Sequence, residues 1–153
     1  MTAEMVAKAR NNSARSGFEN VDFRLGEIEH LPVADSSIDV VMSNCVINLS
    51  PEKQAVFHEA FRVLKPGGRL AISDVVATAR MPEALANSIA ALAGCIAGAA
   101  LLDELKAMLA TAGFKNIEIT INEQSAEFIR DWLPGSGAEN FVASAVIQAV
   151  KAR

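Results

Sequence analysis

A strand that runs into a capped helix is the feature of this sequence that most restricts its fold. Ile38–Met42 is a short, β-branched and largely apolar run, which predicts a strand covered on both faces. Ser50 then predicts a helix N-cap, and Pro51 suits the first helical position. Cys45 lies between the two, at the carboxyl end of the strand, where open α/β sheets bind their ligands. The junction therefore predicts an α/β fold with a ligand site near Cys45.

The residues before this junction predict a helix, a strand and a loop. Thr2–Ser16 mixes apolar and charged side chains ahead of a glycine, as a surface helix does. Val21–Leu25 alternates apolar and polar side chains, which predicts a half-covered or edge strand. The segment Gly26–Glu29 is then expected to be a loop that leaves the carboxyl end of that strand.

The residues after the junction predict a helix packed on the sheet, followed by a second strand. The helix that starts at Pro51 presents one apolar stripe, formed by Phe57, Ala60, Phe61 and Leu64. Pro66-Gly67-Gly68 ends this helix, and Arg69–Asp74 is the next strand. This alternation of strand and helix predicts parallel pairing through a right-handed crossover.

The carboxyl-terminal half predicts three more helices and two more strands. Residues 82–112 are rich in alanine and predict two helices interrupted near Gly94–Gly98, because glycine weakens a helix interior. The second helix should end at Gly113. Strands are expected at residues 117–121 and 141–150, with a short helix at 126–133 between them.

Composition indicates a single domain with small-molecule partners. The 153 residues are 51% hydrophobic, which suffices for one core, and a net charge of −4 gives no electrostatic reason to expect nucleic acid. The longest apolar run, Ile89–Leu102, is shorter than the roughly 20 residues that span a bilayer, so no membrane partner is expected. Two cysteines do not make a secreted disulfide framework, and residues 1–17 lack a signal-peptide core, so we expect a reduced, cytoplasmic setting.

Four sequence motifs give the chain a resemblance to a known family. They are SNCVINLS at 43–50, RVLKPGGR at 62–69, SDV at 73–75 and GCIAG at 94–98. Together they closely resemble the S-adenosylmethionine-dependent arsenite methyltransferases, and the likeness covers nearly the whole chain. The LKPGG portion is shared by many class I methyltransferases, whereas the first and last motifs in combination are much more specific.

The resemblance implies an α/β fold: an incomplete class I methyltransferase (Rossmann-like) sheet with helices on both faces. The strand order of that fold is usually 3-2-1-4-5-7-6, and this chain would begin just after strand 2. The first two strands, the glycine-rich cofactor loop and the ribose-binding acid are therefore expected to be absent. Residues 1–153 would form a single truncated domain, with 1–80 as the remaining cofactor-binding core and 81–153 as the arsenic-binding helices and final strands.

Such an incomplete sheet would separate two of the predicted strands. Val21–Leu25 would lie two places away from Ile38–Met42, and an unpaired edge on a hydrophobic strand promotes aggregation or strand swapping. We therefore predict that these two strands pair directly, or that a second copy of the chain fills the gap in a homodimer.

Cys45 and Cys95 match the arsenic-binding cysteines of the family, so the resemblance implies that both are catalytic and bind the arsenic substrate. Trivalent arsenic is soft, and thiolates are the side chains that suit soft ions. By residue type alone, each cysteine is more often a small buried hydrophobe than a ligand, and a disulfide between them is disfavoured in a reduced compartment. The family uses a further cysteine nearer the amino terminus, so two thiolates and an exogenous thiol would hold the metalloid here.

The resemblance also implies contacts to the cofactor, S-adenosylmethionine. Gly26, Glu27 and Ile28 match the segment that lies along adenine, where a carboxylate or backbone amide meets the ring edge and Ile28 packs on the ring face. Asn44 and Val46 flank the first cysteine and would line the same crevice. Without the family pattern, residues 26–29 would be interpreted as an ordinary surface loop.

Three functions remain in competition. The first is an arsenite methyltransferase homologue, an enzyme that methylates trivalent arsenic supplied as arsenite or its thiol conjugates. The second is a class I methyltransferase acting on carbon or oxygen, which a wide separation of the cysteines would favour. The third is a non-catalytic arsenite-binding fragment. Asp74, at the carboxyl end of its strand, is a further site candidate, although an acid there is often only a turn residue.

Overall fold

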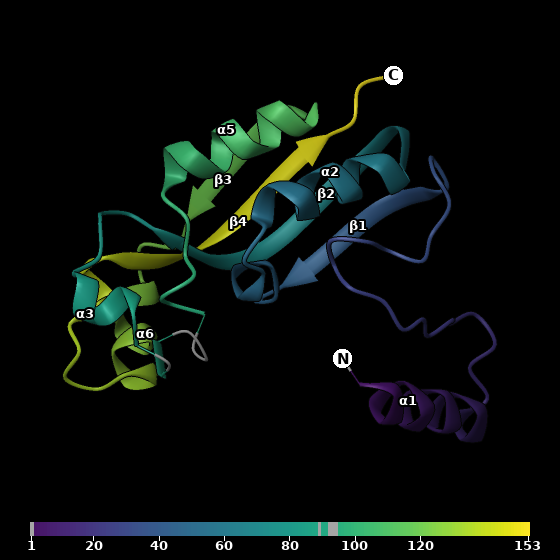
Figure 1. Cartoon of the computed structure of the whole chain (residues 1–153), viewed down its shortest axis with the longest axis horizontal. Helices are drawn as coiled ribbons and strands as arrows, with labels where there is room; N and C mark the ends of the chain where they lie inside the picture. The colour runs from purple at the N-terminus through teal and green to yellow at the C-terminus, as the bar shows by residue number, and fades with distance from the viewer. Residues whose placement is uncertain (1, 89, 92–94) are drawn as a thin grey trace.

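The computed structural model describes residues 2–88, 90–91 and 95–153 of the chain (Figure 1). Its helices and strands are, in order, α1 (Ala3–Ser16), β1 (Ile38–Asn44), the 3₁₀ turn η1 (Ile47–Leu49), α2 (Lys53–Val63), β2 (Leu64–Ala77), α3 (Glu83–Ala86), α5 (Leu102–Ala112), β3 (Lys115–Ile121), α6 (Ser125–Trp132), the 3₁₀ turn η2 (Ala138–Asn140) and β4 (Val142–Val150). The interruption predicted near Gly94–Gly98 is present at Cys95–Gly98, which is non-helical, whereas Gly94 lies outside the described residues.

The four strands form one mixed sheet in the order β1-β2-β4-β3. β1 and β2 are parallel, as predicted from the alternation of strand and helix, and β4 is antiparallel to both of its neighbours (Figure 1). This order equals the last four positions of 3-2-1-4-5-7-6. The predicted partial class I methyltransferase sheet is therefore confirmed.

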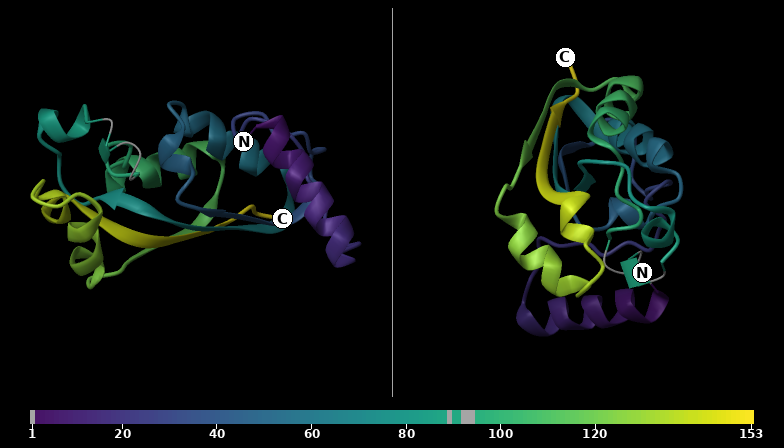
Figure 2. Two further views of the ribbon diagram at one scale, coloured as in Figure 1. Left: turned by 90° about the horizontal axis from the view of Figure 1, so that it is seen from below. Right: turned by 90° about the vertical axis from the view of Figure 1, so that its left-hand side faces the viewer.

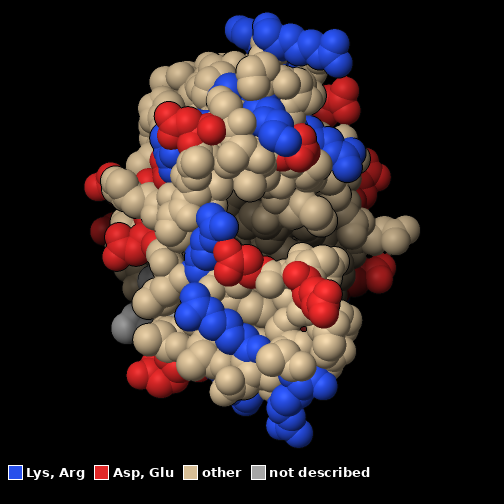
Figure 3. Space-filling model, turned by 90° about the vertical axis from the view of Figure 1, so that its right-hand side faces the viewer, with Lys and Arg blue, Asp and Glu red and all other residues tan. Residues whose placement is uncertain are grey.

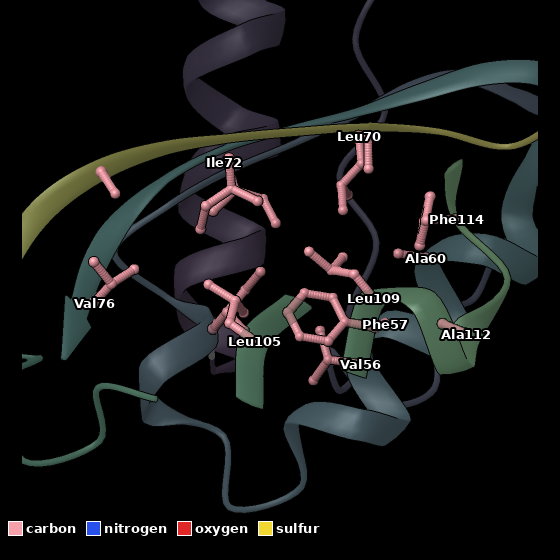
Figure 4. Close-up of a cluster of buried hydrophobic side chains, with 14 of the residues drawn as sticks. Val56, Phe57, Ala60, Leu70, Ile72, Val76, Leu105, Leu109, Ala112 and Phe114 are labelled. Atoms are coloured by element: carbon pink, nitrogen blue, oxygen red, sulfur yellow. The ribbon is translucent and has the colours of Figure 1, made fainter. Parts of the chain in front are cut away.

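The hydrophobic core lies between this sheet and two helices, α2 and α5, which cover one of its faces (Figure 2). Phe57 of α2 and Leu109 of α5 are fully buried against Leu70 and Ile72 of β2 (Figure 4). Burial of large apolar side chains contributes roughly 1.5–3 kcal/mol each, so this contact is a major part of the stability of the sheet. Gly113 ends α5 with a left-handed backbone (φ 106°), as predicted.

The opposite face of the sheet is covered at one end only. There α6 packs its buried Ile129 against Val75 and Val142, so helices do lie on both faces (Figure 2). Farther along this face the side chains are open to solvent: Met42 of β1 is 80% exposed and Val146 of β4 is 48% exposed. Of these two uncovered apolar side chains, Met42 lies on the edge strand β1 and Val146 on the interior strand β4.

The strand predicted at Val21–Leu25 is wrong. Residues 21–25 have no regular secondary structure. Among the described residues, the side-chain hydrogen bond that joins this segment to α1 runs from the Arg10 guanidinium to the Phe23 carbonyl. The segment lies with α1 beyond the edge of β1, and no backbone hydrogen bond joins it to β1 within the described residues. The predicted direct pairing is therefore wrong as well, because an alternating pattern favours a strand only where a partner strand supplies hydrogen bonds.

The predicted start of the helix after the junction is also wrong, by two residues. α2 begins at Lys53, after a bend at Pro51-Glu52. The Ser50 hydroxyl oxygen still accepts the Glu52 N–H, at 3.1 Å, but as a local turn ahead of the helix rather than as its N-cap. The second strand is longer than predicted, since Leu64 already pairs with Ile38.

Charged side chains of both signs are mixed over the surface. On the face shown in Figure 3, basic and acidic groups alternate around a hollow of uncharged atoms. Within the described ranges, none of the helices has the length and hydropathy needed to cross a bilayer.

Candidate functional site

Cys45 follows the last residue of β1 and begins the site. Its backbone N–H still bonds to the Ser73 carbonyl at 2.9 Å, so β2 fixes its position. Its φ is +50°, in the left-handed region, which costs on the order of 1–3 kcal/mol for a residue with a side chain. The chain turns sharply here, and the Cys45 thiol is left partly exposed at the carboxyl end of the sheet.

Cys95 meets Cys45 from the other half of the chain. Its thiol donates to the Cys45 carbonyl with an Sγ to O distance of 3.1 Å, and Cys95 is 7% exposed. Its φ is +60°, so both cysteines have the same strained backbone. Both are free thiols, with no disulfide between them. The structure therefore brings together the two cysteines that the sequence motifs singled out.

Asp74 completes this group. One ligand atom from each of Cys45, Asp74 and Cys95 lies within 4.8 Å of the other two, and we call this set the Cys45–Asp74–Cys95 cluster. Asp74 is only 3% exposed, and its Oδ1 accepts the Val75 N–H at 2.8 Å. Its Oδ2 is buried and has no hydrogen-bond partner within the part of the chain that the structure describes. A buried, half-satisfied carboxylate is costly, which distinguishes it from an ordinary turn residue.

The buried side chain of Asn48 holds the cluster together. Its Nδ2 donates to Asp74 Oδ1 (2.9 Å), to the Val75 carbonyl (2.6 Å) and to the Cys95 carbonyl (3.2 Å). Gly98 packs directly on the same residue, because a Cβ atom there would lie 2.0 Å from the Asn48 carbonyl oxygen. One amide and one glycine thus fix the Cys95 segment against η1 and β2.

Burial and negative charge keep the thiols of the cluster protonated. Burial, with a smaller effect of the Asp74 carboxylate, raises the pKa of Cys45. Burial and then the neighbouring Cys45 and Asp74 raise the pKa of Cys95 to about 11. Burial also raises the pKa of Asp74, an effect that hydrogen bonds from the backbone N–H groups of Val75, Asn48 and Ile47 and, to a smaller extent, the charge of Lys53 partly offset. A cation or a covalent partner that binds the two thiols must therefore displace their protons, so its affinity depends on pH.

An apolar cavity of about 330 Å³ lies beside the cluster, along β1 and α2. Ile28, Asn44 and Val46 all line it, as do Val41 and Phe57. Its volume and apolar walls suit a flat aromatic ring. Three of the five residues that the family pattern assigns to the cofactor therefore lie together on one cavity.

The other two, Gly26 and Glu27, lie in the loop that borders this cavity but not on its wall. The loop is a turn closed by a bridge between Glu27 and His30. It is attached to the rest of the molecule by the Glu29 carboxylate, which accepts the Ser50 hydroxyl, and this bond lowers the pKa of Glu29. The loop predicted at Gly26–Glu29 is thus present.

Reasoning from the sequence missed Asn48 and Gly98 as site residues. Both lie in the motifs that suggested the family, but neither carries a group with chemistry of its own. A polar residue between Ile47 and Leu49, in a short apolar run, was the available signal.

Comparison with known proteins places this architecture in a family. Residues 1–113 match the model of a methyltransferase domain. The chain therefore belongs to the methyltransferase domain family. Within it, the chain is a homologue of the arsenite methyltransferases, since it is 55% identical over 151 residues to the arsenite methyltransferase of Halobacterium salinarum.

Other relatives agree with this assignment. The human arsenite methyltransferase is 44% identical over 103 residues, which is 64% of this chain and 28% of that protein. The crystal structure of an arsenic(III) S-adenosylmethionine methyltransferase from Chlamydomonas reinhardtii matches all of this chain and 53% of that one, at 32% identity and a TM-score of 0.74. The alignment with the Halobacterium salinarum protein takes in 99% of this chain but 39% of that relative's length.

Proposed function

We propose that this chain binds trivalent arsenic through Cys45 and Cys95 as its part of an S-adenosylmethionine-dependent arsenite methylation. The observation that carries the proposal is the convergence of the two thiols at the carboxyl end of the sheet, with Cys95 Sγ 3.1 Å from the Cys45 carbonyl. A methyltransferase acting on carbon or oxygen has no need of two neighbouring thiols. The arsenic proposal therefore accounts for an arrangement that this alternative leaves unexplained.

The chemistry proposed for the two thiols balances without an external base. Arsenite, As(OH)₃, exchanges each As–O bond for an As–S bond, and each thiol proton leaves with the displaced hydroxyl as water. Cys45 and Cys95 supply two sulfurs, and an exogenous thiol, or the thiol conjugate in which arsenic arrives, supplies the third. Trivalent arsenic in three sulfur bonds keeps a lone pair, which is the nucleophile for methylation. Raised thiol pKa values are compatible with this exchange, because the protons are needed to form water.

The cofactor proposal concerns the cavity lined by Ile28, Asn44 and Val46. Its apolar wall fits the face of adenine, whereas no acidic side chain lines it among the described residues, so it has no carboxylate for the ribose hydroxyls. S-adenosylmethionine would supply a methyl group made electrophilic by its sulfonium. We assign Ile28 to the ring face and Gly26 and Glu27 to the ring edge, and we derive no methyl-transfer step from these residues alone.

Two further proposals concern the setting of the chain. The free edge of β1, with the exposed Met42 beside it, is proposed to associate with a second copy of the chain. Two neighbouring thiols that are both free suit a reduced, cytoplasmic compartment. Residues 1–80 carry the proposed cofactor contacts, and residues 81–153 carry the second cysteine and the helix break around it.

Calorimetric titration with arsenite, in the presence of glutathione, tests the proposal. Wild-type protein is expected to bind one arsenic per chain, and Cys45→Ser and Cys95→Ser are each expected to lose at least about 100-fold in affinity, since each removes a direct ligand. Ser37→Ala serves as a control, because the Ser37 hydroxyl is exposed and bonds only to the Ala34 carbonyl among the described bonds. Unchanged arsenite affinity in both cysteine variants would overturn the proposal.

A parallel titration with S-adenosylmethionine separates catalysis from binding alone. Binding that weakens in Ile28→Ala would support the adenine assignment. Arsenite binding without any cofactor binding would identify the chain as an arsenite-binding module instead of a complete methyltransferase.

A further inference from the structure

The proposed arsenic chemistry assigns no role to the buried carboxylate of Asp74. Arsenic in its thiol complexes takes sulfur donors, and a carboxylate oxygen is a hard donor that suits other ions. Yet Asp74 is 3% exposed, its Oδ2 has no hydrogen-bond partner among the described residues, and one of its carboxylate oxygens lies within 4.8 Å of both sulfurs. A carboxylate at this position therefore points to a ligand that takes oxygen and sulfur together.

We propose that Cys45, Cys95 and Asp74 also bind a soft divalent cation of the zinc class, with the carboxylate as third donor, in competition with trivalent arsenic. Two thiolates and one carboxylate are donors that Zn²⁺ accepts, and a fourth position would remain open to water or an exogenous thiol. The inference rests on the same site as the proposed function but does not require that function, because it concerns a different ligand.

The geometry is close to what such a cation needs. With Zn–S near 2.3 Å and Zn–O near 2.0–2.2 Å, the donors of a tetrahedral site lie roughly 3.5–3.8 Å apart. The three donor atoms here already lie within 4.8 Å of one another, and each pair has to close by about 1.3 Å at most. Cys45 is only partly buried, so a change of its side-chain rotamer can supply that movement.

Hydrogen bonds that orient two of the proposed donors, Asp74 and Cys95, are present as well. Asn48 Nδ2 and the Val75 N–H both bond to Asp74 Oδ1, which leaves Oδ2 as the free donor. Such outer contacts orient a ligating carboxylate in metal sites. Cys95 is held through its own carbonyl by the same amide, at 3.2 Å.

Charge distinguishes the two proposed ligands of the site, arsenite and a divalent cation. Arsenite arrives neutral and gains little from a nearby carboxylate, whereas a dication gains strongly from a third negative donor in a site of low dielectric. Cation binding would release the two thiol protons to solvent and would lower the effective pKa values of both cysteines. Asp74 is therefore expected to matter for the dication and to be nearly neutral for arsenic.

Cadmium is the probe for this test, because its sulfur charge-transfer absorption and ¹¹³Cd shift report the number of thiolate donors. The wild-type chain should bind one Cd²⁺ with two sulfur donors, and arsenite should displace it. Asp74→Asn keeps the shape of the side chain and should weaken Cd²⁺ binding at least about 100-fold while arsenite affinity changes less than about threefold. Asp39→Asn, which removes an exposed carboxylate paired with Lys65, is the control and should bind Cd²⁺ as wild type does.

The outcomes distinguish this inference from the proposed function. Wild-type Cd²⁺ affinity in Asp74→Asn, or no Cd²⁺ bound by the wild-type chain, would overturn the inference and leave arsenite binding untouched. If Asp74→Asn does not fold, the ¹¹³Cd shift of the wild-type chain decides, since a sulfur-only signal would contradict the carboxylate donor. Cd²⁺ binding without arsenite binding would support the inference while overturning the proposed function.

Discussion

The side-chain amide of Asn48 bonds to the backbone carbonyl of Cys95 at 3.2 Å, across 47 residues of sequence. The same Nδ2 donates to the carboxylate of Asp74, which lies on β2. The Asn48 amide, on the turn after β1, thus joins β2, which carries Asp74, to the residues around Cys95. These are the two other parts of the chain that build the Cys45–Asp74–Cys95 cluster. Since residues 95–98 form turns and not a helix or strand, their position depends on this contact.

Replacing Asn48 by alanine should therefore loosen the site as well as the fold. The change leaves the buried Val75 and Cys95 carbonyls without this donor, which we expect to lower the free energy of unfolding by about 2–3 kcal/mol. Arsenite affinity should fall roughly 10-fold or more, as when an outer contact of a metal ligand is lost. Urea unfolding and arsenite titration measure the two effects. Asn140→Ala, which removes an exposed amide bonded to Gly137, should change neither.

Gly98 should tolerate no side chain. A Cβ atom there would lie 2.0 Å from the Asn48 carbonyl oxygen, so Gly98→Ala must push the Cys95 segment away from η1. We expect a loss of about 3 kcal/mol in unfolding free energy, at the upper end for overpacked positions, together with weaker arsenite binding. Gly135→Ala is the comparison for a cost of another kind, left-handed backbone strain, which Gly98 does not carry, because Gly135 has φ +77° but open space around it. It should cost only about 1 kcal/mol and leave arsenite affinity unchanged, and equal losses in the two variants would contradict the steric argument.

Alkaline pH should destabilise the protein through Cys95. Its folded pKa of about 11 lies above the value of roughly 8.5 expected for an unfolded thiol. The stabilisation is therefore complete below about pH 8.5 and is lost as pH rises through the folded value, because the unfolded chain then releases its thiol proton first. Thermal melts from pH 8 to 11 should show a steeper fall in Tm for the wild-type chain than for Cys95→Ser. Parallel melting curves in the two proteins would contradict this assignment of the pKa.

The rate of thiol alkylation should also reflect the raised pKa values of the two cysteines. Alkylation requires the thiolate, so a raised pKa makes both cysteines slow to react with iodoacetamide at pH 7.5. The rate in single-cysteine variants should keep rising with pH above 9, where an ordinary exposed thiol levels off. Mass spectrometry of Cys45→Ser and Cys95→Ser gives the rate at each remaining cysteine. A plateau near pH 8.5 in both variants would contradict the effect of burial.

Local sequence patterns predicted most of the fold. Their failures share one physical cause, which is dependence on contacts with residues distant in the sequence. Gly113 marked the end of α5 because a left-handed residue is needed there whatever surrounds it. Val21–Leu25 has the side-chain pattern of a strand, but a strand exists only where another strand supplies its hydrogen bonds. The start of α2 was misplaced because the Ser50 hydroxyl accepts a local N–H and also donates to Glu29, from a distant loop.

The same limit applies to the site. Cys45 and Cys95 could be chosen from the sequence because their motifs are distinctive, and Asp74 because it lies at the carboxyl end of a predicted strand, where α/β sheets bind ligands. Asn48 and Gly98 could not, since their importance lies in the approach of two segments about 50 residues apart. Contacts of that kind depend on the packing of the whole chain, which periodicity and residue type do not describe.

The free edge of β1 should control self-association. Met42 is 80% exposed beside this edge, and large apolar side chains on an open edge strand favour pairing with another chain. Met42→Lys places a charge there, so we expect the sedimentation coefficient at high protein concentration to shift toward that of a monomer, with little change in stability because the side chain is exposed. Val146→Lys is the matched control, since Val146 lies on the interior strand β4 and is 48% exposed. A charge at Val146 that disrupts association as strongly as one at Met42 would place the contact on the open face of the sheet and not on its edge.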